Sequence, residues 1–128
     1  MENDKKIIEL VKGVVEELVK NNIESLPLED DTETMDLREE LDYYPGVMTL
    51  PPEEAYYQLD DIIYIYKQTV PHFRLGKNNL KKVFPKLLYM VDFDLYYDNE
   101  RSDLTLQCNV YEDKHGEWFI KVSNIHVM

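Results

Sequence analysis

The chain has 128 residues, an apolar fraction of 44% and a net charge of −12, which together predict one folded domain spanning residues 1–128. The negative charge argues against direct binding to nucleic acid, whose phosphates would be repelled, and no apolar run approaches the ~20 residues of a membrane span. The single cysteine, Cys108, excludes an internal disulfide and fits a cytoplasmic, reducing compartment.

The first predicted element is an amphipathic helix near residues 7–19. Its apolar residues recur at spacings of three and four, as on the buried face of a helix: Ile7, Ile8, Val11, Val14, Val15, Leu18 and Val19. An acidic loop broken by Pro27 follows over 24–33. A second, shorter helix is expected over 36–43, with Thr34 as its N-cap.

Residues 47–50 are expected to form a short extended segment, and Pro51-Pro52-Glu53-Glu54 resembles a helix start. The buried side of that turn is predicted to carry Ala55, Tyr56 and Leu59. Segment 67–86 is basic and irregular, with one or two helical turns expected over 78–84.

The C-terminal half reads as strands. Residues 62–66 are β-branched and aromatic, and 87–97 form a longer pattern of the same kind. Apolar and polar residues then alternate over 104–111 and again over 118–123, with turns at 98–101 and 113–116 between the strands. We therefore expect an α+β fold: N-terminal amphipathic helices packed on a curved antiparallel sheet that ends in a three-strand meander.

The charge is unevenly distributed along the chain. Residues 1–61 carry 18 acidic and 5 basic residues, whereas residues 62–128 carry 8 and 9. Segment 24–42 alone holds nine acids against one base, Arg38. Two interpretations stay open: a solvated face that keeps the protein soluble, or a surface that binds a basic partner.

The second interpretation is strengthened by two tyrosines, Tyr43 and Tyr44, directly after the acidic run. Aromatic anchors surrounded by charge are typical of protein interfaces, although tyrosines on ordinary amphipathic faces would give the same pattern. The residues predicted to contact a partner are Asp30, Asp31, Glu33, Glu39, Glu40, Asp42, Tyr43 and Tyr44.

Three short motifs carry a resemblance: Leu50-Pro51-Pro52-Glu53-Glu54-Ala55, Arg101-Ser102-Asp103-Leu104-Thr105-Leu106 and Asn124-Ile125-His126-Val127. The chain resembles a family of small, uncharacterised bacterial domains with these motifs, some of which are similar to immunity proteins of polymorphic-toxin and contact-dependent inhibition systems. The resemblance implies an immunity protein, and the acidic segment predicts that it binds and neutralises a basic toxin domain, such as a nuclease. The family's shape is similar to the cone of nuclear-transport-factor-2-like proteins.

No catalytic or metal-binding motif is present in the sequence. We therefore expect no enzyme activity, no cofactor and no metal, and a monomer or weak dimer. Segment 101–103 suits turn chemistry better than binding. The alternative function is a small-molecule-binding protein or enzyme with a pocket between helix and sheet, where His126 or Asp92 would lie inside.

Overall fold

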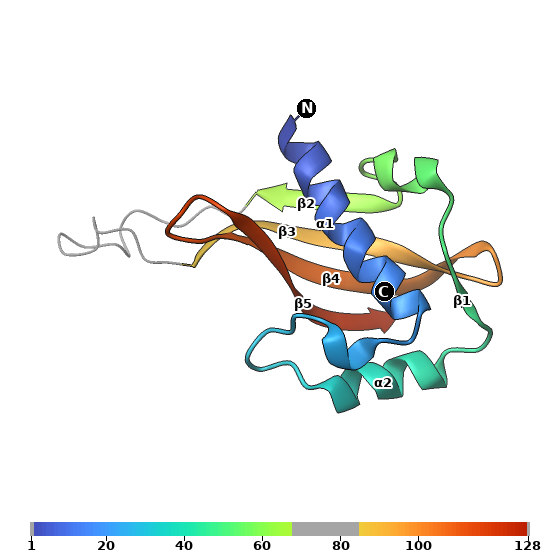
Figure 1. Ribbon diagram of the computed structural model, residues 1–128. Helices are drawn as coiled ribbons and strands as arrows, with labels where there is room; N and C mark the ends of the chain where they lie inside the picture. The colour runs from blue at the N-terminus through green and yellow to red at the C-terminus, as the bar shows by residue number, and fades with distance from the viewer. Residues whose placement is uncertain (1, 68–84, 128) are drawn as a thin grey trace.

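The computed structural model describes residues 2–67 and 85–127, and Figure 1 shows one sheet with a long helix laid across it. The predicted helical turns over 78–84 lie outside the described residues. The helical elements are α1 (Glu2–Val19), α2 (Thr34–Tyr43) and the 3-10 turns η1 (Ile23–Ser25) and η2 (Glu53–Tyr57). The strands are β1 (Met48–Thr49), β2 (Ile63–Lys67), β3 (Lys86–Tyr97), β4 (Glu100–Glu112) and β5 (Trp118–Val127).

The five described strands form one open antiparallel sheet. β3, β4 and β5 are the predicted meander, and β1 and β2 pair with different parts of the remaining edge of β3. The α+β prediction, with a strand from the segment around residue 62 beside the meander, is confirmed. The likeness to the nuclear-transport-factor-2-like cone stays a prediction.

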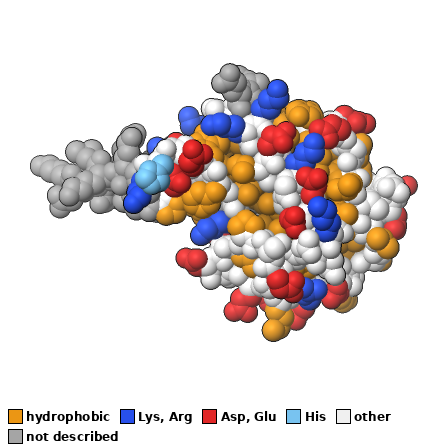
Figure 2. All heavy atoms as spheres, viewed as in Figure 1, with side chains coloured by type: hydrophobic (Ala, Val, Ile, Leu, Met, Phe, Trp, Pro, Cys, Tyr) orange, Lys and Arg blue, Asp and Glu red, His pale blue; other side chains and the backbone are white. Residues whose placement is uncertain are grey.

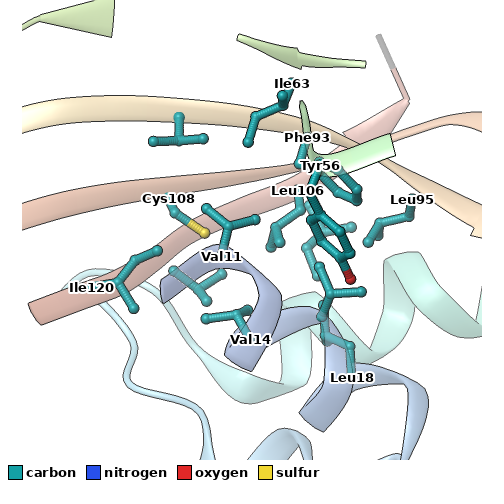
Figure 3. Packing of buried hydrophobic residues seen from close by; sticks show 14 of the residues in the cluster. Val11, Val14, Leu18, Tyr56, Ile63, Phe93, Leu95, Leu106, Cys108 and Ile120 are labelled. Carbon is teal, nitrogen blue, oxygen red and sulfur yellow. The ribbon is translucent and has the colours of Figure 1, made fainter. Parts of the chain in front are cut away.

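The core lies between α1 and one face of the sheet, as Figure 3 shows for Val11, Val14 and Leu18. Tyr56 of η2 stacks on Phe93 of β3, with ring centroids 5.1 Å apart and planes 9° apart. Every apolar residue predicted for the helix stripe is buried except Val19, which is half-buried against the core. Burial of this stripe, more than helix propensity, holds α1 on the sheet.

Just after α1 comes a left-handed residue, Asn21, with φ of 62°. The amides of Asn21 and Asn22 return to the carbonyls of Leu18 and Glu17 at 3.0 and 2.9 Å. These two bonds form a Schellman motif, in which asparagine tolerates the left-handed conformation that most residues avoid. The expected helix stop at 21–22 is therefore confirmed.

The register of β3 turns its two acids away from α1. Val91, Phe93 and Leu95 are buried under the helix, whereas Asp92 and Asp94 alternate onto the outer face and are half-buried. Thr105 and His126 are paired across β4 and β5, in line with Asp94. His126 and Asp92 consequently lie outside the space between helix and sheet, contrary to the pocket hypothesis.

Part of the acidic loop pairs with the edge of the sheet, a contact that the sequence did not predict. Val122 of β5 donates to the Pro27 carbonyl at 2.7 Å, and the Glu29 amide donates back to Val122 at 3.0 Å. The Thr32 hydroxyl adds a bond to the Ser123 carbonyl at 2.9 Å. These contacts cover the middle of an edge strand that would otherwise expose unpaired backbone groups.

Two finer predictions are wrong. The N-cap of α2 is Glu33, with extended backbone and no side-chain cap bond, and Thr34 is already helical. Leu59 is 44% exposed, because η2 is a 3-10 turn that ends at Tyr57 and leaves Leu59 beyond its buried side.

Candidate functional site

The outward face of α2 is an acidic stripe around one exposed aromatic ring. Asp36, Glu39, Glu40 and Tyr43 occupy positions i, i+3, i+4 and i+7 of the helix, which lie on one side of it. All four are exposed, and Tyr43 is the extreme case at 92%. We call these four residues the α2 stripe. Leu37 points away from this stripe and is buried against the core.

The α2 stripe places like charges close together on one helix. Asp36 lies near Glu39 and Glu40 on consecutive turns, and such like-charged pairs each destabilise a helix by about 0.2–0.5 kcal/mol. Glu40 and Asp42 also lie in the last turn, where no basic residue is present and the helix dipole disfavours negative charge. These terms disfavour the acids of the last turn, whereas Asp36 in the first turn is favoured by the same dipole.

Tyr43 and its neighbour Tyr44 have different surroundings. Tyr44 packs on Tyr97 of β3, with ring centroids 4.7 Å apart, and its hydroxyl donates to the Asp103 carboxylate. That hydrogen bond raises the pKa of Tyr44 above its ordinary value. Tyr44 fastens the end of α2 to the β3–β4 hairpin, so the exposed ring of the pair belongs to Tyr43.

The acids of the loop before α2 divide into two groups. Asp30, Asp31 and Glu33 are exposed, and among the residues that the structure describes only Asp30 is near a base, with its carboxylate 4.0 Å from Lys121 Nζ. Glu29 instead accepts hydrogen bonds from Asn109 and Tyr111 and anchors the loop to β4. The three exposed acids extend the negative surface of α2 toward β5.

Figure 2 shows red acidic side chains along the lower rim of the molecule, over α2 and the loop before it. Within this region Arg38 pairs with Glu24 rather than facing the stripe. Glu39, Glu40 and Asp42 are all exposed on α2. The structure thus brings seven of the eight predicted contact residues to an exposed acidic surface, and places Tyr44 beside it, half-buried.

Sequence reasoning missed two residues of this surface. Asp36 belongs to the α2 stripe, and Met35, 66% exposed, lies on its flank beside Asp42. The sequence could have predicted that Asp36 belongs with Glu39, Glu40 and Tyr43, because any helix over these residues places positions 36, 39, 40 and 43 on one side.

Segment 101–103 serves structure. The Arg101 guanidinium bonds to Asp94 Oδ2 at 2.8 Å and to Asp61 Oδ1 at 2.9 Å, joining the β3–β4 hairpin to the loop before β2. The Ser102 hydroxyl donates to the Leu95 carbonyl and accepts from the Leu104 amide. The segment lies in β4, just after the turn, and the Ser102 contacts with nearby backbone agree with a structural role in the hairpin.

A groove of about 590 Å³ opens where the sheet extends past the start of α1. It is lined by Lys5, Lys6, Glu9, Leu10, Glu117 and Trp118, with Lys6 Nζ 4.6 Å from the centre of the Trp118 ring. Among the described residues, no three His, Cys, Asp or Glu side chains are grouped as metal ligands would be. The described helices include none long and apolar enough to cross a bilayer.

Comparison with known proteins gives a family and no further relatives. Residues 9–128 match the model of a family described as a domain of unknown function (DUF7668). The chain belongs to this family, whose domain spans α1 from Glu9 to the end of the meander. Searches of curated proteins and of solved structures found no match.

Proposed function

We propose that this protein binds a basic protein partner through the α2 stripe and the exposed acids of the preceding loop. The observation that carries the proposal is Tyr43, 92% exposed among three carboxylates of its own helix face. An exposed tyrosine contributes a rigid apolar body and a polar tip to an interface, and such residues concentrate binding energy when a partner covers them.

The carboxylates give this surface its selectivity. Acids from 30 to 42 lie on a chain with a net charge of −12, so they attract a basic protein from beyond contact distance and repel an acidic one. Their main effect is on the association rate, whereas Tyr43, once desolvated, slows dissociation.

Taken with the sequence resemblance, these features favour an immunity protein acting in the cytoplasm. The partner would be a nuclease toxin domain, whose basic substrate groove normally receives phosphates. Carboxylates arranged along a helix would occupy that groove in place of the phosphates. The proposed mechanism is inhibition by binding, and it uses no catalytic residue of this chain.

The small-molecule alternative has less support. Buried side chains fill the space between α1 and the sheet, and His126 and Asp92 are on the opposite face of the sheet. The groove beside Trp118 lies at the sheet's end and contains neither residue.

The proposal is tested by capture and neutralisation. Tagged wild-type protein is incubated with lysate of its source strain, and a captured basic protein is then expressed in a bacterial host with and without this chain. A variant with Glu39→Gln, Glu40→Gln and Tyr43→Ser should lose capture and growth protection at least tenfold. The control variant, Glu16→Gln with Glu54→Gln, changes exposed acids away from α2 and should behave as wild type.

Equal protection by wild type and the α2 variant would refute the placement of the interface. Capture of a non-toxic basic protein would refute the immunity role and leave the binding role in place.

A further inference from the structure

The outer face of the sheet is polar and aromatic, and no described helix packs on it. Across its middle run Tyr64, Asp92, Gln107 and Asn124, which are paired neighbours on β2, β3, β4 and β5. Paired side chains on one face of antiparallel strands are about 5 Å apart at Cβ. This row is therefore a continuous surface built on rigid strands.

Two carboxylates on this face have different partners. Asp94 is neutralised within the chain, because Arg101 donates to it through Nε at 3.0 Å and Nη2 at 2.8 Å. Asp92, one pleat away, accepts a single hydrogen bond from the described part of the chain, from Gln107 Nε2 to Oδ1 at 3.2 Å. Among residues 2–67 and 85–127, no lysine or arginine pairs with Asp92.

Asp92 is half-buried, which makes an unneutralised charge there unfavourable. Burial raises the pKa of its carboxyl above the ordinary value, and Asp94 nearby adds to that, while the Gln107 hydrogen bond and the neighbouring His126 act in the opposite direction. A cation bound at Asp92 would neutralise its carboxylate, as Arg101 neutralises Asp94.

Two tyrosines lie beside Asp92. Tyr64 is its direct cross-strand neighbour, and the rings of Tyr64 and Tyr66 stack with centroids 6.4 Å apart and planes 10° apart. Tyr66 is 48% exposed, so part of this tyrosine pair faces solvent. A planar guanidinium can bond to a carboxylate while it stacks on a tyrosine ring, which an ammonium does less well.

We propose that Asp92, with Gln107 and the Tyr64–Tyr66 pair, is a receptor for one arginine side chain of the basic protein partner. The inference rests on the proposed function for the nature of that partner and adds a second contact on the outer sheet face. Arg101 on Asp94 is the internal example of the same pairing, one pleat away on the same face.

The test uses the whole folded chain and a defined probe. The tripeptide acetyl-Gly-Arg-Gly-amide is titrated into ¹⁵N-labelled protein, with acetyl-Gly-Lys-Gly-amide at the same ionic strength as the comparison. The arginine peptide should give saturable amide shifts at Tyr64, Asp92 and Gln107, at least threefold tighter than the lysine peptide. Asp92→Asn, which keeps an oxygen for Gln107, should weaken binding at least tenfold, with a folded spectrum otherwise like wild type.

Two further variants separate this site from the α2 stripe. Tyr64→Leu should abolish the preference for arginine over lysine, and Glu39→Gln should leave the shifts unchanged. Equal binding by wild type and Asp92→Asn, or shifts confined to α2, would overturn the receptor. Because the tripeptide needs no natural partner, that failure would leave the proposal for α2 standing, whereas failed toxin neutralisation alone would not remove the arginine site.

Discussion

Replacing Leu37 with alanine should detach α2 from the sheet. Leu37 is 1% exposed and is the one fully buried residue described in α2, which lies against β5 and η1. A buried leucine truncated to alanine costs about 2–5 kcal/mol of unfolding free energy. A domain of this size has roughly 6–19 kcal/mol in total, so the variant should still fold.

The assay is urea unfolding followed by circular dichroism. A loss of about 3 kcal/mol, with an m-value of about 2 kcal/mol/M, lowers the urea midpoint by about 1.5 M. The matched control is Met35→Ala, on the same helix but 66% exposed, which should change stability by no more than about 0.5 kcal/mol. Equal midpoints for the two variants would refute the packing of α2 through Leu37 and, with it, the rigid presentation of the α2 stripe.

Two other predictions concern glycines and tyrosines. Gly13→Ala should stabilise the protein by about 1 kcal/mol, because Gly13 is exposed within α1 with open space at its Cβ position. Gly46→Ala should destabilise the protein by about 1–3 kcal/mol, because the φ of Gly46 is +103° and the new Cβ would lie 2.6 Å from Asp98 Oδ2. The melting temperature should rise for Gly13→Ala and fall for Gly46→Ala. Shifts of the same sign would contradict the backbone conformations described for the two glycines. Burial raises the pKa of Tyr97 and of Tyr111 to about 12, from 10.0. The folded state therefore holds these protons more tightly than the unfolded state, and this stabilisation is present below pH 10 and lost as the pH rises toward 12. Absorbance at the phenolate band should show a late-titrating class that Tyr97→Phe diminishes, and a single midpoint near 10 in the folded protein would contradict the burial.

Periodic elements were predictable because their signals are local. The spacing of Ile7, Val11, Val14 and Leu18 describes a helix face whatever it packs on, and alternation over 104–111 describes a half-buried strand. The opposite faces of β3 also followed from this alternation, since Val91 and Phe93 could only be buried together.

The missed features depend on contacts between distant residues. The 27–29 segment pairs with Val122 in β5, and nothing local in an acidic, Pro-containing stretch indicates that partner. Tyr43 and Tyr44 are adjacent tyrosines that the sequence does not distinguish, and the position of Tyr97 determines which of the two rings is exposed. The same holds for Arg101, which pairs with Asp61, 40 positions away, rather than with its neighbour Asp103.

The most direct test of the central claim is the association rate of the purified chain with its captured partner, measured by stopped flow at several salt concentrations. Charge reversal at Asp30, Asp31 and Glu33, as Asp30→Lys, Asp31→Lys and Glu33→Lys, should slow association at low salt at least tenfold and flatten its salt dependence. These side chains are exposed, so the fold should be retained. A rate that is unchanged by the reversal, with the same salt dependence, would contradict binding through the acidic surface.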